Sequence, residues 1–163
     1  MRIVILFLIF TSNILAEEIT GIPRIVDGDT VHINGYKIRL EGIDAPEMRQ
    51  QCKKVKLKIS SIIGFTLYKN YNCGEVSKEN LETKVDRSKI KCISSSKDRY
   101  QRYLSKCFKD KINLNRWMVR NGHAVAYKRY SQEYVPDEDF AKANKLGLWQ
   151  GKFLNPEKWR KLN

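Results

Sequence analysis

The feature that most restricts the fold is the Asn34-Gly35 dipeptide, which lies between two segments of alternating apolar and polar residues. Asn-Gly in this setting is typical of a two-residue β-hairpin turn. The alternation predicts strands over residues 30–33 and 36–43 that fold back on one another, with one apolar and one charged face. The apolar face carries Val31, Ile33, Ile38 and Leu40, and the charged face carries Lys37, Arg39 and Glu41.

Three other segments have the composition of strands. Residues 21–26, 84–93 and 100–108 are rich in β-branched and aromatic side chains, and turn-type residues bound them. With the hairpin, these segments bring the number of expected strands to five.

The rest of the chain predicts helices. Apolar residues at helical spacing favour a helix over residues 53–68, and residues 70–82 read as a polar loop. A second helix, capped by Asn113, is expected to run to Asn121, and a third to open at Pro136. Five strands with about three α-helices predict an α+β fold, namely a five-stranded OB-fold barrel.

The first sixteen residues have the form of a secretory signal peptide, with a positive start, an apolar run and Ala16 at the expected cleavage point. The run is shorter than the ~20 residues that span a bilayer, and an uncleaved anchor is the alternative. We expect residues 17–163 to form a single domain, periplasmic or secreted. We expect no stable membrane insertion after cleavage.

The charge of the chain points to a polyanionic partner. The sequence carries a formal charge of +13, and removing residues 1–16 takes away one Arg and no acid, which leaves +12. Nucleic acid is the leading candidate for a basic domain of this size. An anionic membrane surface is the alternative, but no segment is a basic amphipathic helix with a broad apolar face.

Four cysteines in an exported chain favour two disulfides. Cys92 and Cys107 lie in two strand-like segments joined by a turn, so we pair them across a hairpin, and Cys52 then pairs with Cys73. A zinc site is disfavoured because there is no Cys-x-x-Cys pair and only two histidines are present.

Carboxylates gather between Asp27 and Glu47 in spite of the basic composition. Taken separately, Asp27-Gly28 is a common turn, and Asp44-x-x-Glu47 fits a capping box for the helix expected after it. The hairpin changes this interpretation. Asp29 opens one of its strands and Asp44 ends the other, so both lie at the same edge of the sheet, near Arg39 and Glu47.

This combination suits metal-assisted attack on a phosphodiester. Carboxylate oxygens select calcium or magnesium, and an open site also accepts a phosphate oxygen. A further carboxylate beside the metal can take a proton from water. Arginine can hold two phosphate oxygens at once. A histidine-based mechanism is disfavoured, since only His32 and His123 are available.

These motifs together resemble the staphylococcal nuclease (thermonuclease) family over nearly the whole of residues 17–163. The order and spacing of the motifs carry the resemblance. They are Asp27-Gly-Asp-Thr30, Arg39-Leu40, Ile43-Asp-Ala-Pro-Glu47, Asp98-Arg-Tyr-Gln-Arg102, Gly122-His-Ala-Val-Ala-Tyr127 and Gly147-Leu-Trp149.

The resemblance implies a calcium site. Asp29 and Asp44 would bind Ca²⁺ through their side chains, and Asp27 would support the metal from the next shell. Ala45 stands where the family usually has Thr, but that position acts through its backbone carbonyl, which alanine retains.

The resemblance also implies catalytic roles. Glu47 would be the general base, and Arg39 and Arg102 would bind the phosphate and stabilise the transition state. Gln101 replaces a Gly usual before the second arginine, and residues 49–54 read as a short basic loop in place of a long substrate loop. Arg99, Tyr100 and Tyr127 would contact the nucleotide.

The function expected from these features is calcium-dependent endonuclease or exonuclease activity on DNA and RNA, with low sequence specificity and 3′-phosphate products. The alternative is a non-catalytic OB-fold module that binds single strands by charge and stacking. We expect a monomer with no obligate protein partner.

Overall fold

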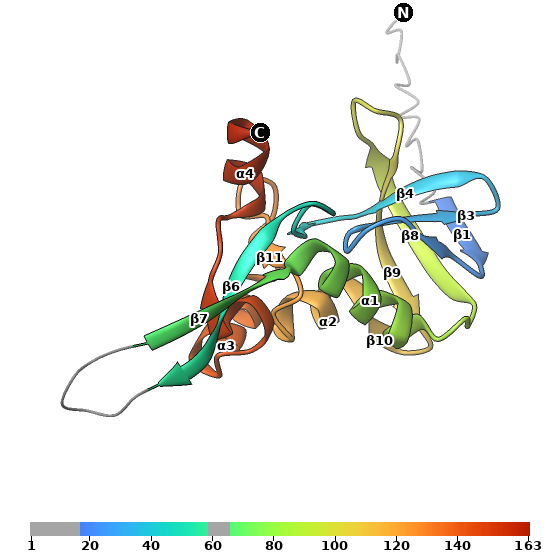
Figure 1. Ribbon diagram of the computed structural model, residues 1–163. Helices are drawn as coiled ribbons and strands as arrows, with labels where there is room; N and C mark the ends of the chain where they lie inside the picture. The colour runs from blue at the N-terminus through green and yellow to red at the C-terminus, as the bar shows by residue number, and fades with distance from the viewer. Residues whose placement is uncertain (1–16, 59–65) are drawn as a thin grey trace, which may run out of the picture.

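A curled sheet forms the body of the protein (Figure 1). The computed structural model describes residues 17–58 and 66–163, so the predicted signal peptide lies outside the described residues. The strand order is β1-β8-β9-β4-β3-β2, with β10 paired to β9, and β4 runs parallel to β9. The strands are β1 (Glu17–Gly21), β2 (Arg24–Ile25), β3 (Thr30–Ile33), β4 (Tyr36–Leu40), β8 (Ile90–Lys97), β9 (Tyr103–Lys109) and β10 (Ile112–Asn113).

The hairpin at Asn34-Gly35 forms as predicted. Both turn residues have positive φ, 48° and 86°, and β3 pairs antiparallel with β4. All four residues of the predicted apolar face are buried and contribute to the main core: Val31, Ile33, Ile38 and Leu40.

In residues 17–58 and 66–163, four helices and one 3-10 turn accompany the sheet, which confirms the α+β class and a half-barrel consistent with the OB-like fold. Asn113 caps the second helix as predicted, because its side chain accepts from the Arg116 N–H. The third helix has Pro136 in its first turn. The elements are α1 (Cys73–Val85), α2 (Leu114–Arg120), α3 (Val135–Ala143), η1 (Gly147–Gln150) and α4 (Pro156–Leu162).

The helix predicted over residues 53–68 is wrong. The described parts of this segment belong to β6 (Gln51–Lys58) and β7 (Thr66–Asn72), which pair into a long hairpin, while residues 59–65 lie outside the described residues. Because no helix follows Glu47 directly, the capping-box interpretation of Asp44 and Glu47 is also wrong. The short loop predicted over residues 49–54 is wrong as well, since β6 begins at Gln51. The apolar residues of the segment 53–68 do recur at helical spacing in the sequence, but the described ones, Val55, Leu57 and Leu67, are exposed, so this spacing does not mark the buried face of a helix.

The polar loop predicted over residues 70–82 is also wrong, because α1 begins at Cys73. The helix buries small side chains, Gly74 and Ser77, beside Leu81 and Val85. A helix that packs through small residues has no broad apolar stripe, so the sequence pattern does not reveal it.

Two disulfides form with the predicted pairing. Cys92–Cys107 joins the paired strands β8 and β9, and Cys52–Cys73 joins β6 to the start of α1. A second small core surrounds the latter bridge and includes Leu148. Short strands complete this side: β12 (Gly151–Lys152) pairs with β6, and β5 (Ile43–Asp44) pairs with β11 (Val125–Ala126).

Among the described helices, none has the length and apolar character needed to cross a bilayer.

Candidate functional site

Arg39 lies at the centre of the predicted acidic cluster and bridges two of its members. Its Nη1 donates to Asp29 Oδ1 at 2.7 Å, and its Nη2 donates to Asp44 Oδ1 at 2.9 Å. Both carboxylates are buried, with Asp44 only 1% exposed. The sheet thus brings Asp29, Arg39 and Asp44 together, as the hairpin argument predicts.

The backbone around β3 and β5 fixes the orientation of Asp29. Its Oδ2 accepts from the Ala45 N–H at 2.8 Å, and its Oδ1 accepts from Thr30 Oγ1 at 3.0 Å. Asp27 Oδ1 accepts from the Asp29 N–H at 2.9 Å, which forms the turn before β3. These contacts join Asp27, Asp29 and Ala45 into one structural unit.

Burial and mutual repulsion dominate the electrostatics of the acids. Burial, with the nearby Asp29 charge, raises the pKa of Asp27 to about 6. Burial also raises the pKa of Asp44, although arginine contacts oppose the change. Burial disfavours the charge on Arg39, but Asp29 and Asp44 outweigh it and raise the arginine pKa. A cluster with this excess of buried negative charge favours a further cation.

Arg160, which the sequence pattern does not reveal as a site residue, comes from α4 at the far end of the chain. Its Nη2 donates to Asp44 Oδ2 at 2.9 Å, and its Nη1 donates to Glu47 Oε1 at 2.8 Å. The site is therefore a chain of alternating charges: Asp29, Arg39, Asp44, Arg160 and Glu47. Nothing in the basic tail distinguishes Arg160 from its neighbours Lys158 and Lys161 in sequence.

The main chain at Glu47 is held tightly, although its side chain is 37% exposed. Gln50 N donates to Glu47 O at 2.7 Å, and Glu47 N donates to Gln50 Oε1 at 3.3 Å. Gly74 packs so closely that a β-carbon there would lie 2.0 Å from the Glu47 carbonyl oxygen. The N-terminus of α1 therefore positions Glu47, and only glycine fits at this contact.

The predicted residues Arg99, Tyr100 and Arg102 form a separate group at the β8–β9 turn. Arg102 pairs with Asp98 at 2.7 Å, and the guanidinium groups of Arg99 and Arg102 lie 4.8 and 5.4 Å from the centre of the Tyr100 ring. Gln101 takes a φ of +61°, so the turn keeps the backbone conformation that glycine favours. Within the described part of the chain, no hydrogen bond or ion pair joins this group to the Asp29 cluster.

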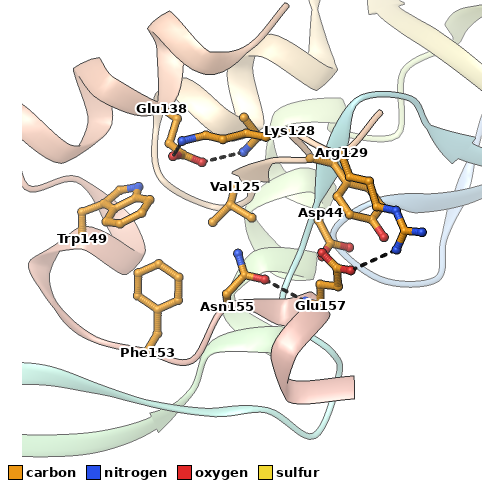
Figure 2. Close-up of a pocket in the computed structure, with 11 residues that line it drawn as sticks. Asp44, Val125, Lys128, Arg129, Glu138, Trp149, Phe153, Asn155 and Glu157 are labelled. Atoms are coloured by element: carbon orange, nitrogen blue, oxygen red, sulfur yellow. Dashed lines mark hydrogen bonds and ion pairs between the residues drawn. The ribbon is translucent and has the colours of Figure 1, made fainter. Parts of the chain in front are cut away.

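Tyr127 lines a pocket that shares Asp44 with the acidic cluster. Figure 2 shows this pocket, with Asp44 among its labelled residues. The pocket has a volume of ≈ 380 Å³, within the range of small-ligand sites. Lys128 pairs with Glu138, and Arg129 pairs with Glu157, so both cations at its rim are neutralised. Burial raises the pKa of Tyr127, and so, to a lesser degree, does the charge of Asp44.

The donor set fits calcium by its chemistry. In residues 17–58 and 66–163, no three acidic, histidine or cysteine side chains lie close enough to enclose a metal ion. The expected set contains only two side chains, Asp29 and Asp44, completed by the Ala45 carbonyl and water. Two adjacent, buried carboxylates on a rigid backbone are hard oxygen donors of the kind that calcium prefers.

Similarity to known proteins agrees with this geometry. Residues 37–151 match the family described as Staphylococcal nuclease homologue. The succinoglycan biosynthesis protein ExoI of Rhizobium meliloti is 31% identical over 83% of this chain, which spans 66% of that protein. An uncharacterized endonuclease of Haemophilus influenzae is 29% identical over 98% of this chain and 82% of its own length. An uncharacterized endonuclease of Escherichia coli O157:H7 is 29% identical over 86% of this chain and 84% of its own length.

The fold and site define a small half-barrel protein with an acid-and-arginine centre at one edge of its sheet. The chain belongs to the staphylococcal nuclease family, and by this membership it is a nuclease.

Proposed function

We propose that the protein is a calcium-dependent phosphodiesterase that cleaves DNA and RNA with low sequence specificity. The observation that carries the proposal is the bridging of two buried carboxylates, Asp29 and Asp44, by one half-buried arginine, Arg39. Two carboxylates held rigidly at one edge suit a divalent cation and a phosphate.

Asp29, Asp44 and the Ala45 carbonyl would hold calcium, and Asp27 would support Asp29 through the turn before β3. Bound there, calcium would act as a Lewis acid that polarises a phosphate oxygen. Arg39 uses one N–H from each of two Nη atoms for Asp29 and Asp44. It therefore retains N–H groups for the phosphate.

Glu47 would take a proton from the attacking water. Its carboxylate is partly exposed while its backbone is fixed by Gln50 and Gly74, so the base is rigid and still reachable. Arg160 contacts Glu47 on one oxygen, Oε1, and no contact occupies Oε2 in the described part of the protein. The second oxygen is the one we assign to proton transfer.

Arg102 would bind the phosphate from the β8–β9 turn, and Arg99, Tyr100 and Tyr127 would contact the nucleotide. By register, Arg102 stands two residues before Leu104, which pairs with Arg39 on the neighbouring strand. Arg102 thus lies directly before the start of β9, the strand that pairs with the strand of Arg39. In the free protein, Asp98 accepts a hydrogen bond from the Arg102 side chain, so the guanidinium group is ordered before substrate binds.

Two disulfides support a location outside the cytoplasm, because such bridges persist in oxidising compartments. We propose the periplasm or the external medium.

The test is cleavage of plasmid DNA and of RNA by the purified protein in calcium and in a chelator, beside the variant Glu47→Gln. We expect cleavage in calcium only, and a loss of at least about a hundredfold in the variant. Retardation of nucleic acid by both forms without cleavage would instead establish the non-catalytic binding module. Undiminished cleavage by the variant would remove Glu47 from its role.

A further inference from the structure

The β6–β7 hairpin extends away from the body of the protein (Figure 1). Its charged residues are all basic. Between Glu47 and Glu75 the sequence contains no acidic residue. It contains six basic residues, namely Arg49, Lys53, Lys54, Lys56, Lys58 and Lys69.

Several basic residues elsewhere on the surface have a carboxylate partner, whereas the hairpin lysines whose side chains the structure describes have none. Lys106 pairs with Glu133 and Lys128 pairs with Glu138 elsewhere on the surface. No ion pair of the described residues involves the exposed side chains on the hairpin and its neighbour β12, which are Lys53, Lys54, Lys56, Lys69 and Lys152.

The strand register brings like charges directly opposite one another. Lys54 faces Lys69 across β6 and β7, and Lys53 faces Lys152 across β6 and β12. Directly opposed like charges destabilise a sheet, so this arrangement has a cost in the free protein. An external anion would relieve the repulsion. Because Lys53 and Lys54 point to opposite faces of the sheet, each face carries one such pair.

Aromatic rings accompany the lysines on the hairpin. Lys54 Nζ lies 5.6 Å from the centre of the Tyr71 ring, and Lys152 Nζ lies 4.9 Å from that of Tyr68. Tyrosines interspersed with lysines are typical of surfaces that bind nucleic acid through phosphate contacts and base stacking.

The base of the hairpin is fixed to the residue proposed as the catalytic base. Gln50, which precedes β6, exchanges two hydrogen bonds with Glu47. The Cys52–Cys73 disulfide joins β6 to α1, and Gly74 of α1 packs on Glu47. A strand of nucleic acid lying along the hairpin therefore leads to the site.

We propose that the β6–β7 hairpin is a nucleic-acid-binding arm that holds the phosphate backbone of a polymeric substrate outside the cleavage site. This inference rests on the proposed function and adds a substrate class, long polymers in preference to short oligonucleotides. The eight residues of β6 extend about 26 Å, the length of roughly seven phosphates along one strand of a duplex. Lysine contacts to phosphate carry no sequence information, so the arm is indifferent to sequence.

An anionic membrane is the competing partner for this surface, because Val55, Leu57 and Leu67 are exposed among the lysines. Nucleic acid is favoured because both faces of the hairpin carry charge, whereas a surface that lies on a bilayer needs one apolar and one polar face.

The test compares Lys54→Gln/Lys69→Gln with the control Lys89→Gln/Lys111→Gln, which removes two exposed lysines far from the hairpin in sequence. Each pair is placed in the Glu47→Gln protein, and fluorescence anisotropy measures binding of a labelled 30-nucleotide duplex and a 4-nucleotide strand against salt. We expect the hairpin variant to bind the 30-mer on the order of tenfold more weakly, with a salt slope reduced by about 1.8, and to bind the 4-mer unchanged. The control should match the parent.

Equal loss in the control, or 30-mer binding unchanged in the hairpin variant, would overturn the arm. If the hairpin variant lost binding to phosphatidylserine vesicles but kept its binding to the 30-mer, the arm would also be overturned, and the surface would be assigned to a membrane. Because this assay measures binding alone, a protein that binds through the hairpin but cleaves nothing would refute the proposed function and leave the arm standing.

Discussion

Replacing Arg160 with alanine removes the cation that joins the C-terminal helix to the acidic cluster. The wild-type guanidinium contacts Asp44 at 2.9 Å and Glu47 at 2.8 Å. Asp44 keeps Arg39 as a partner in the variant, whereas the contacted oxygen of Glu47 loses its partner among the described residues. The variant should therefore fold, with reduced stability in the absence of metal.

The size of the loss follows from the exposure of the partners. A buried hydrogen bond to a charged group contributes about 1.5–3 kcal/mol to stability. Asp44 is only 1% exposed but Arg160 is 32% exposed, so we assign their contact to the lower end of this range. The contact with Glu47, 37% exposed, belongs near the ~0.5 kcal/mol of surface pairs. Together they predict a loss of about 2 kcal/mol, or a fall in Tm of about 6 °C.

Calcium should reduce the difference in stability between the wild type and Arg160→Ala. A cation at Asp44 competes with Arg160 in the wild type, but not in the variant. We expect Arg160→Ala to bind calcium about tenfold more tightly, the equivalent of the ~1.4 kcal/mol contact with Asp44. The difference in Tm should therefore shrink as calcium is added.

Thermal unfolding in a chelator and across a calcium titration measures both effects. Lys161→Ala is the matched control, because among the described residues Lys161 pairs only with the half-buried Glu157, and its loss should change Tm by less than about 2 °C. An unchanged Tm for Arg160→Ala in the chelator, or an equal calcium response in both proteins, would refute the reasoning.

Three further substitutions test residues in and around the site. Gly74→Ala forces a β-carbon against the Glu47 carbonyl, so kcat should fall by about tenfold or more. Binding of a 30-mer by this variant should be retained. An unchanged kcat would show that α1 does not position Glu47. Burial lowers the pKa of His123 to about 4, so its contribution to stability is present above pH 6.5 and is lost as pH falls toward 4. Urea unfolding at pH 7 and pH 4.5 should therefore show an acid loss about 2 kcal/mol smaller in His123→Gln than in wild type, and equal losses would contradict this. Gln101→Gly relieves a φ of +61° and should stabilise the protein by about 1 kcal/mol with cleavage retained, whereas a loss of cleavage would show that the Gln101 side chain helps to aim Arg102.

Local chemistry explains which parts of the fold could be predicted from the sequence. Asn34-Gly35 restricts the backbone so strongly that one turn sets the register of β3 and β4, and with it the meeting of Asp29, Arg39 and Asp44. The Cys92–Cys107 bridge follows from the same kind of short-range pairing.

The failures have a different physical origin. The described apolar residues of the segment 53–68, namely Val55, Leu57 and Leu67, are exposed on a projecting hairpin, so no buried face constrains their spacing. Helix α1 packs through Gly74 and Ser77, which carry no hydrophobic signal. Arg160 reaches Glu47 across 113 residues of sequence, and only the tertiary fold brings them together.

Direct calorimetric titration with calcium is the measurement that tests the central claim most closely, because it measures the metal site independently of cleavage. The account predicts one calcium per chain in the wild type and in Glu47→Gln, and binding weakened by at least about a hundredfold in Asp44→Asn. Failure of the wild type to bind calcium, or unweakened binding by Asp44→Asn, would contradict it.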